Sequence, residues 1–197
     1  MDDFRDIKVT EGQNHRVQVR NPTAYPLIGL GDQGAVFLLD SGRCVKIFAN
    51  AKEAGREAAA YRKCRHSPLL PRLFEYGRNY LVMEYVKGQP LDEYIKAKAG
   101  IPFSLSIQIV NAVKEMKRLG FKRLDVSMRH ILVGSRNTLK VIDHVNSFVL
   151  RSPKPSSLLR SLRDMGLLEA FLAHVKVIDR ELYLEWTDGP KEEKING

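Results

Sequence analysis

Asp125, His130 and Asp143 carry side chains that could bind a metal ion or move a proton. Two short apolar runs flank a Gly/Ser/Asn turn at 134–138, and this pattern predicts an antiparallel hairpin. With the turn centred near 136–137, facing residues have numbers that sum to about 273, which places His130 opposite Asp143. A carboxylate and an imidazole would then converge at the open end of the hairpin.

Two interpretations of these three residues stay open. In the first, they form a charged site that holds a metal ion, with an acid/base group nearby. In the second, Asp125 caps a turn, and His130 and Asp143 form a structural pair.

A glycine-rich segment nearer the N-terminus could hold phosphate groups. Gly29, Gly31 and Gly34 fit G-x-G-x-x-G, and Val36 follows them. The segment leads into a strand-like apolar run, which favours a hairpin flap whose N–H groups can approach phosphate oxygens, because glycine has no Cβ to obstruct them. The alternative is an ordinary glycine-rich hairpin turn.

Lys46 lies inside the apolar strand predicted at 44–48. The helix predicted after it offers Glu53 and Glu57, which lie one turn apart on the same face. A lysine held by a helix glutamate is a fixed positive charge that could bind an anionic ligand. The alternative is a surface ion pair worth ~0–1 kcal/mol.

The run 81–88 leads from an apolar strand into a linker that contains Gly88 and Pro90. Backbone donors and acceptors at such a strand end are free of a further ladder. They could therefore hydrogen-bond the edge of a flat heterocycle.

The elements that must position these residues divide the chain into a β-rich and an α-rich part, which predicts an α+β fold. Strands fill roughly 1–86, together with one alanine-rich helix at about 51–65 that begins after Asn50. A helical period dominates beyond the linker. Helices are expected at 91–99, at 104–119, and as one or two helices within 158–186, and the tail 189–197 is expected to fray.

Composition and charge exclude several classes of protein for this chain. The chain has 197 residues, and its two cysteines have no CxxC spacing, so we expect neither a disulfide scaffold nor a zinc knuckle. The acidic start lacks the apolar core of a signal peptide and no apolar run could span a bilayer, so a soluble, cytoplasmic protein is expected. The net charge of +9 is scattered, which makes nucleic-acid binding a less favoured partner interaction than general attraction of anions.

Taken in order, these motifs resemble those of protein kinases over roughly 25–148. The glycine segment resembles the kinase glycine-rich loop, and Val45-Lys46-Ile47 resembles V-A-I-K. The run from Leu124 to Leu132 resembles the catalytic loop H-R-D-L-x-x-x-N-I-L. Val141-Ile142-Asp143-His144-Val145 resembles the strand that leads into D-F-G.

The resemblance implies a protein-kinase-like, two-lobed fold in a single domain, 1–197. Its β-rich N-lobe would cover about 1–86, its hinge about 84–90, and its truncated α-helical C-lobe about 91–188.

The resemblance also implies how ATP would bind. Lys46, positioned by Glu57, would grip the α/β-phosphates. Met83 would be the gatekeeper, while the Glu84 carbonyl and the Val86 amide would contact adenine. The phosphates would be covered by Gly29, Gly31, Gly34 and Val36.

The same resemblance assigns the chemistry to three residues. Asp143 would hold the metal ion, Mg²⁺ or Mn²⁺, that bridges the phosphates, with His130 as the second candidate ligand. Asp125 would orient the attacking hydroxyl and accept its proton.

Departures from the family pattern point to a small, atypical, RIO-like kinase of bacterial type. Asp125-x-Ser127 is closer to the D-L-S of that group, and Leu124 replaces the arginine that reads a phosphorylated activation loop. The D-F-G glycine and the A-P-E motif are missing. His130 stands where the family has Asn, and because imidazole suits manganese better than magnesium, we expect Mn²⁺ to support nucleotide binding or turnover better.

The sequence therefore predicts a serine/threonine-type phosphotransferase that uses ATP and a hydroxyl-bearing acceptor, which is either a protein or a small molecule. One alternative is a small-molecule kinase on the same scaffold, acting on a sugar, an aminoglycoside or a lipid-like hydroxyl. Another is a pseudokinase that binds nucleotides and partners without transferring phosphate.

Overall fold

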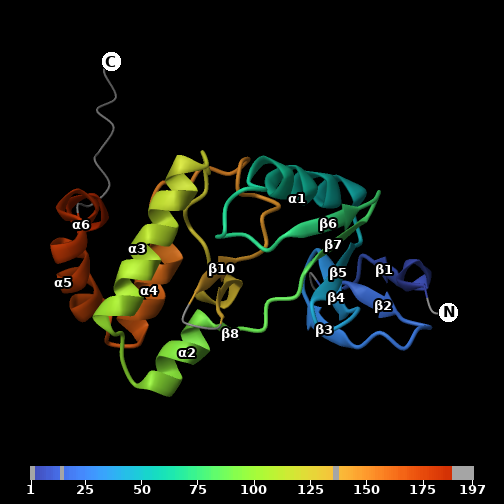
Figure 1. Cartoon of the computed structure of the whole chain (residues 1–197), viewed down its shortest axis with the longest axis horizontal. Coiled ribbons are helices and arrows are strands. Elements are labelled where there is room, and N and C mark those ends of the chain that lie inside the picture. Colours follow the sequence, from blue (N-terminus) through green and yellow to red (C-terminus); the bar gives the residue numbers. More distant parts are fainter. Residues whose placement is uncertain (1–2, 14–15, 135–137, 188–197) are drawn as a thin grey trace, which may run out of the picture. The chain divides into compact units, whose positions relative to one another are not determined.

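The computed structural model describes residues 3–13, 16–134 and 138–187 (Figure 1). The chain divides into two compact units. The first runs to Gly88 and also includes Lys140–Phe148, and the second comprises Gln89–Leu139 and the chain from Val149 on. The predicted tail 189–197 lies outside the described residues.

A five-stranded antiparallel sheet forms the centre of the first unit, in the order β3-β4-β5-β7-β6. The register pairs Val36 with Lys46 and Lys46 with Leu81. The hairpin predicted at the glycine-rich segment and the strand predicted at 44–48 are confirmed. The strands are β3 (Leu27–Leu30), β4 (Gly34–Leu38), β5 (Arg43–Phe48), β6 (Leu73–Tyr76) and β7 (Tyr80–Glu84).

Helix α1 (Ala51–Lys63) packs on β5, β6 and β7 (Figure 1). It begins where predicted, because the Asn50 side chain accepts a hydrogen bond from the Lys52 amide at 2.9 Å. Before the sheet come η1 (Phe4–Asp6) and a ribbon of β1 (Lys8–Thr10) and β2 (Gln18–Arg20). Their apolar side chains join those of the sheet in one core: Phe4, Ile7, Val9, Val17, Ala35, Phe37, Val45, Ile47 and Val82.

The second unit is mainly helical. Helix α5 contacts α3, α4 and α6 around the buried side chains of Phe171 and Val175. The helices are α2 (Leu91–Lys98), α3 (Phe103–Arg118), α4 (Ser156–Asp164), α5 (Leu168–Ile178) and α6 (Arg180–Thr187), with the short η2 (Met128–His130). Strands β8 (Gln89–Pro90) and β9 (Ile131–Val133) pair antiparallel, and β10 (Leu139–Val141) is the other neighbour of β9.

The segment predicted as one or two final helices contains three. Gly166 adopts φ +70°, which ends α4, and an extended Asp179 separates α5 from α6. Gly166 and Asp179 therefore divide this segment into three helices.

The predicted pairing of His130 with Asp143 stays a prediction. Strands β9 and β10 are neighbours. Because β9 begins at Ile131 and β10 ends at Val141, neither His130 nor Asp143 belongs to the ladder. The Gly134 amide donates to the Thr138 carbonyl at 2.8 Å, which offsets facing residues by one from the predicted register. The predicted turn centre at Arg136 and Asn137 lies outside the described residues.

Candidate active site

Lys46 is a largely buried cation between two carboxylates of the first unit. Its Nζ donates to Glu57 Oε2 at 2.6 Å and to Asp143 Oδ1 at 3.1 Å. The side chains of Lys46 and Glu57 are 13% and 1% exposed, whereas that of Asp143 is 34% exposed. Of the two helix glutamates that the sequence offers, the structure pairs Glu57 with the lysine. The lysine is thus fixed from behind, and Asp143 keeps a face toward solvent.

The electrostatics of this cluster keep the lysine charged. Burial alone would lower the pKa of Lys46, but the Glu57 and Asp143 carboxylates outweigh it and raise that pKa. Burial also raises the pKa of Glu57, and the charge of Lys46 opposes this effect. The His144 backbone N–H donates a further hydrogen bond to Glu57, which ties the helix glutamate to the segment that carries Asp143.

Asp143 has a constrained backbone. Its φ of +67° lies in the left-handed region, which Asp and Asn tolerate better than most residues. The next residue, His144, is buried and stacks edge-on against Tyr61 at 5.3 Å. Its Nε2 lies 2.8 Å from the Val141 carbonyl, which can only accept, so Nε2 carries the proton of this bond. These contacts fix the turn that presents the Asp143 carboxylate.

The glycine-rich segment is a tight hairpin between β3 and β4. Gly29 faces Val36 across the strands, and the Gly31 amide donates to the Gly34 carbonyl at 3.0 Å. At Gly34, a Cβ would come within 2.4 Å of the Ile47 carbonyl oxygen, so only glycine fits there. The hairpin that the sequence predicts is confirmed, while its contact with phosphate stays a prediction.

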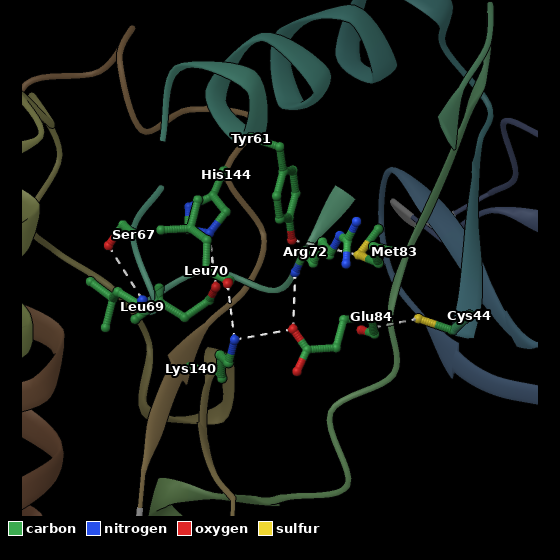
Figure 2. A network of polar contacts seen from close by, with 11 residues as sticks. Cys44, Tyr61, Ser67, Leu69, Leu70, Arg72, Met83, Glu84, Lys140 and His144 are labelled. Carbon is green, nitrogen blue, oxygen red and sulfur yellow. Dashed lines mark hydrogen bonds and ion pairs between the residues drawn. The ribbon is translucent and has the colours of Figure 1, made fainter. Parts of the chain in front are cut away.

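The predicted hinge residues follow one another from the end of β7. Met83 is buried and its sulfur accepts a hydrogen bond from the Tyr61 hydroxyl at 3.5 Å. Within the described residues the Val86 N–H has no acceptor, as a contact with adenine requires. Figure 2 shows Lys140 and the Arg72 backbone on two sides of the Glu84 carboxylate.

Asp125 lies in the second unit, where its carboxylate contacts the first turn of α4. Ser157 donates its backbone N–H to Oδ1 at 2.5 Å and its hydroxyl to Oδ2 at 3.0 Å. Both oxygens of the predicted base therefore accept hydrogen bonds, one of them from a hydroxyl at the distance that proton transfer needs. This geometry also fits the capping role that the sequence left open.

His130 ends η2, where its backbone N–H donates to the Ser127 carbonyl at 2.9 Å. Across residues 3–13, 16–134 and 138–187, no group of three or more His, Cys, Asp or Glu side chains is placed to hold a metal ion. Magnesium needs only one or two carboxylates when substrate phosphates complete its shell. The partly exposed Asp143 carboxylate fits that requirement, and the role of His130 stays a prediction.

Sequence reasoning missed two partners of the site. Ser157 lies 32 residues beyond Asp125, and the only local signal was its position after the Pro-containing break at 152–156. The ion pair of Lys140 with Glu84, at 3.0 Å, joins residues 56 apart. An apolar-flanked lysine three residues before Asp143 was its only trace in the sequence.

No protein-family model matches the chain. It is 29% identical over 122 residues to the protein named "Putative serine/threonine-protein kinase YrzF" of Bacillus subtilis (strain 168), which covers 59% of this chain and 57% of the relative. It is 36% identical over 69 residues to the "Probable serine/threonine-protein kinase CPE1738" of Clostridium perfringens (strain 13 / Type A), covering 33% of this chain and 10% of that relative. The chain thus spans little more than half of the first relative and a small part of the second.

These similarities support a kinase-like relationship. The crystal structure of WbdD is also similar, with 20% identity, a TM-score of 0.47, and coverage of 66% of this chain and 34% of that one. Both relatives carry names of serine/threonine-protein kinases, one putative and one probable. Within the described part of the chain, no helix is long and apolar enough to cross a membrane.

Proposed function

We propose that the protein is an ATP-dependent phosphotransferase of the serine/threonine type, which passes the γ-phosphate of metal-bound ATP to a hydroxyl group. The observation that carries this proposal is the arrangement of Lys46 between the buried Glu57 and the partly exposed Asp143. A surface lysine needs no such frame, whereas a lysine that must hold phosphate oxygens in one position does.

Each residue of the site then has a role in positioning or charge stabilisation. Lys46 binds the α/β-phosphates under the hairpin of Gly29, Gly31 and Gly34, and Asp143 would hold the divalent metal, which supplies charge neutralisation between the phosphates. Asp125 orients the acceptor hydroxyl and accepts its proton. In the structure the same carboxylate accepts a hydrogen bond from the Ser157 hydroxyl.

We further propose that the two units are the N-lobe and the reduced C-lobe of a small, atypical, RIO-like kinase. The five-stranded sheet with α1 supports the N-lobe assignment of the first unit. The helical second unit with its short β8–β9 pair supports the C-lobe assignment. The acceptor is a protein or a small molecule, and a phosphorylation-gated activation segment is not part of the proposal.

The test is a transfer assay with labelled ATP, with Mg²⁺ or Mn²⁺, and with a protein acceptor or a panel of hydroxyl metabolites. We expect Asp125→Asn to abolish transfer and to leave ATP binding intact. Asn keeps an acceptor for the Ser157 amide, so the variant separates chemistry from the cap of α4. Undiminished transfer by a folded Asp125→Asn variant would contradict the assignment.

A second function, nucleotide binding without transfer, is favoured by one observation. Ser157 engages both oxygens of the Asp125 carboxylate, so the base has no oxygen without a partner. Calorimetry that shows ATP binding, beside an assay that shows neither transfer nor hydrolysis with either metal, would establish this function instead.

A further inference from the structure

A pocket lies in the first unit, between the end of α1, the loop that follows it, and the edge strand β6. Its volume is about 590 Å³, within the range of small-molecule sites. The cluster of Lys46, Glu57 and Asp143, here called the Lys46 cluster, does not line this pocket. The cationic side chains at its wall are Arg62, Arg65, Arg72 and Lys140, with His66 beside them. No aspartate or glutamate lines the pocket.

Two carboxylates near the pocket, Glu75 and Glu84, already have hydrogen-bond partners. Glu75 accepts hydrogen bonds from Arg5 at 2.6 Å and from the Tyr80 hydroxyl at 2.6 Å. Glu84 accepts from the Arg72 backbone N–H and from Lys140, each at 3.0 Å.

Among the described residues, the guanidinium groups of Arg62, Arg65 and Arg72 form no ion pair with a carboxylate. Three unneutralised arginines around one hollow create a positive potential that an anion would relieve.

Aromatic rings hold two of these arginines. The Arg62 guanidinium lies 5.6 Å from the ring centre of Tyr76, and that of Arg72 lies 5.1 Å from the ring centre of Phe74. Both rings are nearly half exposed on β6, at 48% and 45%. A guanidinium that lies over a ring contacts it with the flat face of the guanidinium. The N–H groups at the edge of the guanidinium therefore stay available for bidentate hydrogen bonds to phosphate oxygens.

The polar network of Figure 2 holds three residues that line the pocket, Leu70, Arg72 and Lys140. Lys140 donates to the Leu70 carbonyl at 3.1 Å as well as to Glu84. The Val141 amide donates to the Leu69 carbonyl at 2.8 Å, and the Glu84 amide to the Arg72 carbonyl at 2.8 Å. The loop that carries Arg72 is thus tied to β7 and β10, so its backbone is ordered before any ligand binds.

We propose that this pocket binds a small phosphorylated molecule through Arg62, Arg65 and Arg72. A single phosphate would occupy only part of the volume, so the natural ligand carries a second phosphate or an organic group beside the first. A concave site with its cations on several sides fits a compact polyanion better than an extended strand of nucleic acid, which binds along a groove. The proposal is independent of phosphotransfer at Lys46.

The test is calorimetric titration of inorganic pyrophosphate into the full chain in EDTA, which removes divalent metals. The double variant Arg62→Gln/Arg72→Gln should weaken binding by roughly tenfold or more, because each charge-assisted bond is worth about a factor of ten. Arg78→Gln is the matched control, since Arg78 is exposed on the β6–β7 turn and does not line the pocket. Equal affinity in the double variant and the control overturns the proposal.

Two further arms locate the site and define the ligand. Lys46→Met that is folded by its unfolding curve should bind pyrophosphate as tightly as the wild type. Loss of binding in this folded variant, with binding kept in Arg62→Gln/Arg72→Gln, would mean that pyrophosphate occupies the site of Lys46, Glu57 and Asp143 instead. A single-stranded oligonucleotide should bind more weakly than pyrophosphate in the salt of the assay. Tighter oligonucleotide binding that the double variant abolishes would replace the small ligand by nucleic acid.

Discussion

Among single residues, the buried Glu57 depends on the charge of Lys46, which lies 2.6 Å away. Replacing Lys46 with Met should destabilise the fold by about 3 kcal/mol at neutral pH, because a buried carboxylate then loses its cation. Urea unfolding of both proteins measures the difference. The control is Lys46→Met/Glu57→Gln, which removes the buried charge and should regain much of the loss.

This loss should depend on pH in a definite direction. Burial raises the pKa of Glu57 above its unfolded value of about 4.5, and removing Lys46 raises it further. A group whose folded pKa is raised costs stability as pH rises through that range and costs nothing once both states are protonated. The difference between wild type and Lys46→Met should therefore be smaller at pH 5 than at pH 8, and a difference that grows toward acid would contradict this account.

Asp143 offers a separation of backbone strain from chemistry. Its left-handed φ of +67° should cost about 1–2 kcal/mol when the residue becomes Ala and much less when it becomes Asn. Both variants lose the carboxylate, so both should lose phosphotransfer. Denaturant unfolding beside the transfer assay tests the pair, and equal stabilities would show that the backbone there is not strained.

At the scale of the element, the β3–β4 hairpin depends on one glycine more than on its neighbour. A Cβ at Gly34 would meet the Ile47 carbonyl oxygen at 2.4 Å, whereas at Gly31 the nearest atom lies at 3.6 Å. Gly34→Ala should therefore force β4 away from β5 and cost about 1–3 kcal/mol. Gly31→Ala is the matched control and should leave the unfolding midpoint nearly unchanged; a similar loss in both variants would place the cost in the loop rather than in the sheet.

Helix α6 is held at its start by Asp179, whose side chain accepts from the Leu182 amide at 2.9 Å and pairs with Lys114 at 2.6 Å. The Leu182 amide, followed by Lys114, lowers the pKa of Asp179, so its contribution is complete above the unfolded pKa and fades as pH falls toward the folded one. Asp179→Ala should cost about 1 kcal/mol at pH 7 and less in acid, while Asp179→Asn keeps the cap. Thermal unfolding at pH 7 and pH 3 checks both variants.

Local patterns in the sequence predict some of these elements, whereas contacts between distant residues are not predicted. The hairpin of glycines, the strand of Lys46 and the cap at Asn50 follow from turn chemistry, apolar runs and propensity, which are local. The contact of Asp125 with Ser157 spans 32 residues, and no local pattern encodes which helix start a carboxylate will meet.

The register of the β9–β10 hairpin differs by one residue from the prediction for a related reason. A shift of one residue reverses which face each side chain occupies, and the register depends on a turn length that composition does not fix. The pocket lined by Arg62, Arg65 and Arg72 could not be predicted from the sequence either. Arg62 and Arg72 come from different elements, which only the packing of α1 on β6 brings together.

At the scale of the whole molecule, metal-bound ATP should stabilise the folded chain by mass action. A ligand at 100 times its Kd adds about 2.7 kcal/mol to the free energy of unfolding when it binds only the folded state. Calorimetric melts with ATP and either metal measure this gain, and Lys46→Met should remove it because the phosphates lose their cation. A gain that survives in Lys46→Met would place the nucleotide elsewhere.

The choice of metal tests His130 in the same melts. If its imidazole joins Asp143 at the metal, Mn²⁺ should give a larger stabilisation with ATP than Mg²⁺, because nitrogen ligands favour the later metal. His130→Asn supplies an oxygen in place of the nitrogen and should shift the preference toward Mg²⁺. An imidazole that only contacts a phosphate oxygen would instead lower the gain with both metals equally when it is replaced. Equal gains with the two metals, in the wild type and in His130→Asn alike, would remove His130 from the metal site and leave Asp143 as its ligand from this chain.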